Sequence, residues 1–311
     1  MFAAALAVAV SAQTSLDPMR LPIGRPGELR VELGTVYDLR LGRASSIAEF
    51  AAAADAHRFV FLGEHHDNLV HHRTQAEVIE ALASRGRDVI VGLEMFTRPV
   101  QESLNPWTLG WWTEDEFISR ADWKGQWGFD FALYRPIFEA VRRHRLPMVA
   151  LNVPRDWVRS VGRGGPTALS AEQRSQVPEI DTSNRNHRMV FDSLMGGHPM
   201  TGAQGENVYA AQVLWDVAMA DSALKYLEKR PPSSRTVFVV IAGSGHVMYG
   251  QGINFRIGQR TGETGLTLTM GTAKAAAEVS RGIGDFVLIT KEVPRNPGEA
   301  SKTPTSPRGP A

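Results

Sequence analysis

The sequence of 311 residues contains no cysteine. This absence excludes disulfide bonds, thiolate metal ligands and a cysteine nucleophile, and we expect no lipid anchor attached through cysteine. An excess of charge of either sign is also missing, because 34 basic and 33 acidic side chains leave a net charge of +1. A chain so balanced has no electrostatic basis for binding nucleic acid or an anionic membrane surface, so we expect neither partner.

Long hydrophobic runs are missing as well. Residues 2–10 form an apolar segment, but it is shorter than the roughly 18–20 residues that a membrane helix needs. Small residues follow it, which is typical of a signal-peptidase site. We therefore expect residues 1–12 to be the remnant of a signal peptide and the protein to be periplasmic or secreted. Residues 293–311 are rich in proline, serine, glycine and charge, and we expect a disordered tail there.

Between these ends, residues 30–292 alternate short apolar runs with helical patterns. Continuous apolar runs that stop at glycine are typical of strands buried on both faces of a parallel sheet. The alternation predicts a single α/β domain with a largely parallel central sheet and helices on both faces. We expect strands near 37–40, 59–62, 89–93, 147–151, 236–242, 266–270 and 286–290, and helices near 46–54, 69–84, 136–144 and 206–229.

Two segments break this alternation, residues 97–130 and 162–205. Both come after a predicted strand, at the end where a parallel sheet binds its ligands. We therefore expect both to form a helical lid over the C-terminal edge of the strands. The first segment holds five of the seven tryptophans, which we interpret as core and lid packing rather than as a cofactor site.

Glutamate and histidine residues gather at this edge. Glu64 and His66 follow one predicted strand, Glu94 follows the next, and His246 follows a glycine-rich turn after the most apolar strand. Because the carboxyl ends of parallel strands share one edge, we expect these side chains to converge. Carboxylate and imidazole together suit general acid–base catalysis or a divalent metal ion. The four are therefore candidate catalytic residues and candidate metal ligands.

The other histidines are less informative. His71 and His72 lie on the first turn of the following helix, where their imidazoles either reach a ligand or are solvated. Gln212, Asp216 and Met219 share one face of a long helix, and this stripe faces either the site or water. We expect the remaining four at the surface: His57, His144, His187 and His198.

Seven motifs occur in a fixed order between residues 37 and 290: 63–68, 92–96, 127–136, 149–155, 211–216, 219–221 and 242–250. Together they resemble the ChaN-type haem-binding uptake family. Its superfamily also holds erythromycin-esterase-like enzymes and Tiki-type metalloproteases, which share the turn formed here by Gly63, Glu64 and His66. The resemblance implies an iron-regulated, haem-binding protein of the cell envelope, with a helical lid over a parallel sheet.

This resemblance implies haem as the cofactor, and an outer-membrane haem receptor as a candidate partner. Haem iron takes His, Tyr, Met or Cys ligands. The candidates here are His246, Tyr249 and Tyr209, while a flat ligand between lids would suit a homodimer. Other candidate haem-binding residues are His71 and His72 and, for the propionates, Arg155 and Arg135.

Two functions stay open at this point. The first is haem binding for iron acquisition or haem handling. The second is esterase- or protease-like hydrolysis, in which Glu64 activates water, His66 and His246 bind a metal or relay a proton, and Glu94 supports them. Four Glu and His side chains suit hydrolysis better than an apolar haem pocket, whereas the family resemblance favours haem. A fold that keeps the cluster without a ligand is a third reading.

Overall fold

The computed structural model describes residues 16–197 and 200–292. The expected signal segment, the expected tail and His198 lie outside these residues. Within the described residues, no helix is both long enough and apolar enough to cross a membrane.

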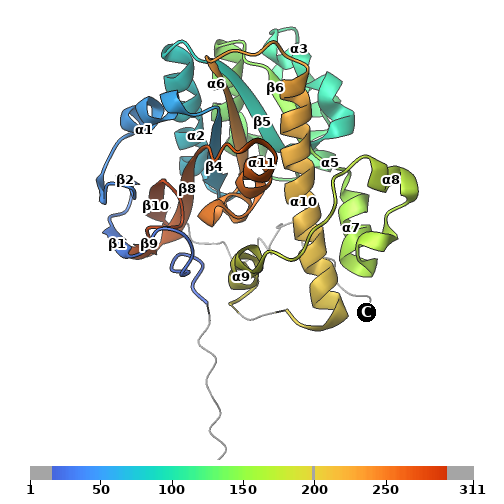
Figure 1. The fold of residues 1–311 in the computed structure, drawn as a ribbon. Coiled ribbons are helices and arrows are strands. Elements are labelled where there is room, and N and C mark those ends of the chain that lie inside the picture. The colour runs from blue at the N-terminus through green and yellow to red at the C-terminus, as the bar shows by residue number, and fades with distance from the viewer. Residues whose placement is uncertain (1–15, 198–199, 293–311) are drawn as a thin grey trace, which may run out of the picture.

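The centre of the molecule is an eight-stranded sheet with the order β3-β2-β10-β8-β4-β7-β5-β6 (Figure 1). The six strands from β10 to β6 run parallel, and β2 and β3 extend one edge antiparallel. This confirms the predicted, largely parallel α/β fold. A separate antiparallel ribbon joins β1 to β9. The strands are β1 (Glu28–Val31), β2 (Val36–Asp38), β3 (Arg43–Ala44), β4 (Phe59–Glu64), β5 (Asp88–Thr97), β6 (Met148–Asn152), β7 (Thr236–Gly243), β8 (Leu266–Ala273), β9 (Ala277–Ser280) and β10 (Phe286–Lys291).

Helices cover both faces of the sheet. Side chains alternate along a strand, so Val60 and Leu62 of β4 face one layer, while Phe59 and Phe61 face the other. The first layer contains α1 (Ile47–Ala53), α2 (Leu69–Ser84) and α6 (Phe131–Arg143). The second contains α10 (Gly202–Glu228) and α11 (Ile253–Thr261).

Capping side chains explain where these helices begin. Asn68 accepts hydrogen bonds from the N–H groups of Val70 and His71, which starts α2 at the predicted residue. The prediction for α6 was wrong at its N-terminus, because it placed Pro136 in the first turn. The structure starts α6 at Phe131, where the Asp130 carboxylate accepts a hydrogen bond from Ala132 N–H.

The two expected lid segments take different paths. After β5, Gln101 hydrogen-bonds to Met148 O and Ala150 N, so the chain runs along the edge strand β6 before it returns. The stretch around Trp127 and Phe129 reaches the strand ends, beside His66. These segments hold α3 (Asn105–Thr108), α4 (Glu114–Arg120), α5 (Trp123–Gln126), α8 (Ala171–Ser175) and α9 (Arg185–Leu194), with α7 (Arg155–Gly164) at the start of the second.

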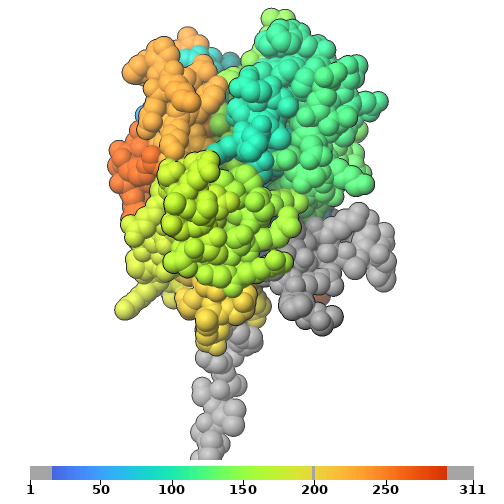
Figure 2. Space-filling model, turned by 90° about the vertical axis from the view of Figure 1, so that its right-hand side faces the viewer, coloured from blue at the N-terminus to red at the C-terminus, as the bar shows by residue number. Residues whose placement is uncertain are grey.

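Helices α7 and α9 pack on the N-terminal half of α10. Val158 and Val161 of α7, Phe191 of α9, and Tyr209 and Leu214 of α10 share one hydrophobic cluster. In Figure 2 the yellow-green surface of the chain around α7 and α8 lies below the teal and green surface of α3 to α6. This packing brings α9 and α10 to the strand ends.

Candidate functional site

The sequence-predicted residues form two groups, one around Glu64 and one around His246, which meet over Gly243, because a Cβ atom there would lie 2.9 Å from His66 Cε1 and 3.7 Å from His246 Cδ2. Strands β4 and β5 both neighbour β7. Glu64 continues the face of Val60 and Leu62, so it points toward α2 and α6. Glu94 has the same parity as Ile90, which packs in the layer of α10 and α11. The two carboxylates therefore meet different helices, although their strands end at the same edge.

Glu64 has two hydrogen-bond partners and a second imidazole close by. Its Oε1 accepts a hydrogen bond of 2.7 Å from the Tyr134 hydroxyl and lies 2.9 Å from His66 Nδ1. Its Oε2 lies 3.1 Å from His72 Nε2. Burial alone would raise the pKa of Glu64, but His72 and His66 outweigh it and hold that pKa well below the usual value. Glu64 is therefore a buried, ionised carboxylate.

His66 is the most exposed member of the cluster, with 23% of its side chain accessible. Its Nδ1 contacts Glu64, whereas its Nε2 makes no hydrogen bond within the described part of the chain. Burial alone would lower the pKa of His66, but Glu64 and Glu94 outweigh it, and the pKa is raised. The ring packs edge-on against Trp127, with centroids 4.8 Å apart.

A glycine makes the position of His66 possible. A Cβ atom at position 243 would lie 2.9 Å from His66 Cε1 and 3.2 Å from His66 Nε2. Real Cβ atoms essentially never approach within 3.0 Å of such an atom. Only glycine lets the imidazole lie over the end of β7 in this way.

In the second group, His246 lies between two carboxylates. Its Nδ1 is 2.6 Å from Asp216 Oδ1, and its Nε2 is 3.3 Å from Glu94 Oε1. Burial alone would lower the pKa of His246, but Glu94 and Asp216 outweigh it and raise the pKa to about 10. His246 is therefore an imidazolium at neutral pH. Both of its nitrogens face carboxylate oxygens in this arrangement.

The second carboxylate oxygen of Asp216 contacts His187. Its Oδ2 lies 2.8 Å from His187 Nε2, and His187 Nδ1 lies 3.0 Å from the Tyr209 hydroxyl. The pKa of His187 is lowered, chiefly by burial, so its imidazole is neutral. The expectation that His187 is a surface residue was wrong, because α9 buries it against α10. These contacts form a chain from Tyr209 to Glu94.

His71 and His72 are both fully buried, so neither is solvated. His72 belongs to the Glu64 group. His71 does not, because its Nε2 bonds to Thr290 Oγ1 at 3.0 Å and its Nδ1 accepts from His65 N–H at 2.9 Å. Burial lowers the pKa of His71 to about 3, so it is a neutral packing residue.

The two tyrosines proposed as iron ligands have other partners here. The Tyr249 hydroxyl donates to Pro18 O and accepts from Leu21 N–H, both at 2.9 Å. The Tyr209 hydroxyl contacts His187 and donates to Asn184 O at 3.2 Å. Among the described residues, neither hydroxyl forms a hydrogen bond with Glu64, His66, Glu94 or His246.

The two candidate arginines differ in position. Arg155 is half-buried at the start of α7 and donates to Trp127 O at 3.1 Å, which places it beside the ring that contacts His66. Arg135 pairs with Glu114 of α4, with its Nη2 2.7 Å from Glu114 Oε1. The structure therefore places the Arg155 side chain near the cluster, whereas the Arg135 side chain of α6 points to α4 and pairs with Glu114.

Sequence reasoning did not assign Tyr134, Trp127 or His187 to the site, although the motif at residues 127–136 contains the first two. Asp216 had a signal in the polar stripe that it shares with Gln212 on α10, and Gln212 Nε2 lies 3.0 Å from His246 Nδ1. Among residues 16–197 and 200–292, no three His, Asp or Glu side chains are arranged to hold a metal ion. The arrangement does provide a carboxylate-supported imidazole, His66, and a fixed cation, His246.

Comparisons with known proteins agree with this fold. The family model for haem-binding uptake proteins of the ChaN type, in the Tiki superfamily, matches residues 50–257. The structure of ChaN of Campylobacter jejuni with cofacially bound haem is 18% identical, with a TM-score of 0.62 over 87% of this chain and 100% of that chain. A search of curated proteins found no match.

Two further structures are more distant. The type III effector HopBA1 is 13% identical, with a TM-score of 0.44 over 80% of this chain and 95% of that chain. A mutant of the erythromycin esterase EreC in its open conformation is 12% identical, with a TM-score of 0.44 over 78% and 77%. Similarity at this level carries no functional argument.

Proposed function

The chain belongs to the ChaN family of haem-binding uptake proteins of the Tiki superfamily, and on this premise we propose that it binds haem at the His66 side of the strand-end cluster. The observation that carries the proposal is the state of His66. Its Nδ1 contacts a buried carboxylate, its Nε2 makes no hydrogen bond to any residue that the structure describes, and it is the most exposed group of the cluster.

The residues around His66 fit a haem. When bound, haem supplies an iron centre with axial positions for protein ligands. A metal-binding histidine typically gives its other ring N–H to a carboxylate, which orients the ring and raises its basicity, and Glu64 is placed to do this. Trp127 and Phe129 offer aromatic surface beside the ring. Arg155, next to Trp127, is placed to pair with a propionate.

The other candidate ligands support His66 by elimination. Both nitrogens of His246 contact carboxylates. The hydroxyls of Tyr249 and Tyr209 are engaged elsewhere. His66 would need to lose the proton on Nε2 before that nitrogen could bind iron.

We further propose a role in iron acquisition or haem handling in the cell envelope, with a periplasmic or secreted location. The apolar segment at residues 2–10 and the family support this placement. An outer-membrane haem receptor and a second copy of the chain remain the proposed partners.

Titration of the purified protein with haemin tests the proposal. We expect a stoichiometric shift of the Soret band that saturates near one haem per binding site, because a specific axial ligand changes the electronic spectrum of the iron. The shift should be lost in His66→Ala and retained in Tyr249→Phe and in the control His144→Ala. No saturable shift in the wild type, or an unchanged shift in His66→Ala, would contradict binding through His66.

Hydrolysis is the second candidate function, favoured by the contact between Glu64 and His66. Glu64 cannot activate water itself, because its oxygens face Tyr134, His66 and His72 in a buried site. Instead, His66 Nε2 would remove a proton from a water molecule that attacks a carbonyl carbon, while Glu64 stabilises the resulting imidazolium. The acyl C–O bond then breaks, and the imidazolium returns the proton to the leaving oxygen.

An ester screen tests this second function. We expect turnover of p-nitrophenyl esters by the wild type to rise with pH as His66 loses its proton, because only the neutral imidazole is a base. Turnover should fall about 100-fold or more in His66→Ala, with His144→Ala unchanged. If the wild type turns over no faster than His66→Ala, hydrolysis by this group is rejected.

A further inference from the structure

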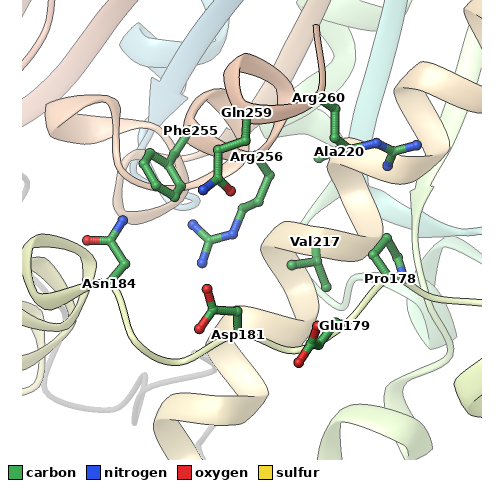
Figure 3. A pocket seen from close by; sticks show the side chains of 10 residues that line it. All are labelled: Pro178, Glu179, Asp181, Asn184, Val217, Ala220, Phe255, Arg256, Gln259 and Arg260. Atoms are coloured by element: carbon green, nitrogen blue, oxygen red, sulfur yellow. The ribbon is translucent and has the colours of Figure 1, made fainter. Parts of the chain in front are cut away.

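A pocket lies between α10, α11 and the segment before α9, and none of the Glu64 or His246 cluster lines it (Figure 3). Val217 and Ala220 of α10 and Phe255 of α11 form part of its wall. Pro178 closes one side. The polar and charged side chains that complete the lining are Glu179, Asp181, Asn184, Arg256, Gln259 and Arg260.

Arg256 places a buried positive charge in the pocket. Arg256 is only 7% exposed, and its Nη1 donates to Gln251 O at 2.5 Å and to Gly252 O at 2.9 Å. Its Nη2 lies 3.4 Å from His187 Nδ1, whereas its Nε donates no hydrogen bond to any residue that the structure describes. Figure 3 shows its guanidinium pointing into the middle of the pocket. A buried guanidinium with an unused N–H is a site for a carboxylate.

The opposite side of the pocket is acidic. In Figure 3 the Asp181 carboxylate faces the Arg256 guanidinium across the pocket, with Glu179 beside it. Within residues 16–197 and 200–292, neither carboxylate forms an ion pair of 4.0 Å or less with any cation. Arg260 does not compensate them, because its Nη1 is 3.0 Å from Asp221 Oδ1. Arg256 has Asp216 as a partner outside the pocket lining, with its Nη1 3.8 Å from Asp216 Oδ2, and on the pocket side it faces two carboxylates without forming an ion pair with either.

Because of these opposite charges, an ion that carries charge of only one sign is a poor ligand for the pocket. A lone anion on Arg256 would be repelled by Asp181 and Glu179, and a lone cation at Asp181 would be repelled by Arg256. A molecule that carries both a carboxylate and an ammonium group can contact Arg256 with the first and Asp181 with the second. The walls formed by Val217, Ala220 and Phe255 are apolar, so they favour a short hydrocarbon group.

We propose that this pocket binds a small zwitterion, an aliphatic α-amino acid. Its carboxylate lies on Arg256, its ammonium group on Asp181, and its side chain against Val217 and Ala220. The pocket is separate from the proposed haem site, so this proposal does not depend on haem binding.

Calorimetric titration of the full chain with L-leucine tests the proposal, with 3-methylbutan-1-amine and 4-methylpentanoate as the two singly charged halves of the ligand. We expect leucine to bind at least about tenfold more tightly than either half, because each half lacks one charge-assisted hydrogen bond. Asp181→Asn should weaken leucine about tenfold and leave 4-methylpentanoate binding unchanged or tighter. Asp115→Asn, an exposed aspartate on α4, is the matched control and should change nothing.

Arg256→Gln is the second variant, and it should remove the preference for leucine over the amine. Arg256 also holds Gln251 and Gly252 and lies 3.8 Å from Asp216, so this variant alone is less decisive than Asp181→Asn at the exposed rim. Three results would overturn the proposal: no leucine binding up to millimolar concentration, equal binding of leucine and a singly charged half, or the same leucine affinity in Asp181→Asn and Asp115→Asn.

Discussion

Replacement of Asp216 by asparagine is expected to destabilise the fold by about 3 kcal/mol near pH 6. Asp216 is buried between His246 and His187, with its two oxygens 2.6 Å and 2.8 Å from their nitrogens. A neutral amide leaves the His246 imidazolium with one carboxylate, Glu94, in place of two. Removing one partner of a buried ion pair costs more than the pair contributes, because the other charge stays buried. Urea-induced unfolding measures the loss directly.

The pH dependence of the free energy of unfolding tests the charge state of His246 more directly than the loss of stability at one pH. The folded pKa of His246 is raised from 6.5 to about 10. Its contribution to stability is therefore fully present below pH 6.5 and is lost as the pH rises from 6.5 toward about 10. The pKa of Asp216 and that of Glu94 are lowered, so their contributions are lost as the pH falls through the acidic range. Wild-type stability should therefore be highest at weakly acidic pH.

Asp216→Asn should flatten the alkaline side of this profile, because the pKa of His246 then lies closer to 6.5. The matched control is Asp221→Asn, on the same helix. Asp221 is also buried, but its partners are Arg98, Arg260 and Lys225, so the control should lose stability without flattening the slope between pH 6.5 and 9. Equal alkaline slopes in the two variants would show that Asp216 does not hold His246 in its charged form.

Replacement of Glu64 by glutamine is expected to weaken haem binding by about 10- to 100-fold. Glutamine keeps the shape of the side chain but removes the charge that supports His66 Nδ1–H. The imidazole then becomes a weaker ligand, and its orientation over Gly243 is less well held. Haemin titration followed at the Soret band measures the affinity, and circular dichroism checks that the variant is folded.

Glu77→Gln is the matched control for this experiment. Glu77 lies exposed on α2, five residues after His72. Its replacement should leave haem affinity unchanged. If a folded Glu64→Gln variant binds haemin as tightly as Glu77→Gln, then His66 either does not bind iron or does so without help from Glu64.

Much of the framework could be predicted from the sequence. The buried strands and α2 follow from local patterns, since continuous apolar runs stop at polar or glycine residues and Asn68 caps its helix. The strand-end positions of Glu64, His66, Glu94 and His246 also follow from these patterns, once the strands are parallel. Asp130, by contrast, was overlooked as a cap, so the start of α6 was misplaced.

The different directions of the Glu64 and Glu94 side chains can be predicted from the sequence. In β4, Glu64 has the parity of Leu62, and in β5, Glu94 has the parity of Ile90. The period of two along a strand assigns each carboxylate to a face. Which helix then covers each face depends on how the chain crosses the sheet.

The partners of each side chain were decided only by the tertiary structure. Tyr249 is three residues from His246, yet its hydroxyl bonds to Leu21, which is 228 residues away in the sequence. His187 resembles a surface histidine until α9 packs on α10 and buries it against Asp216. Local patterns determine which elements form and which residues stand at a strand end, because they act over one or two turns. Hydrogen-bond partners, burial and pKa depend on contacts between distant segments, and these determine that His66 has the free nitrogen and His246 the fixed charge.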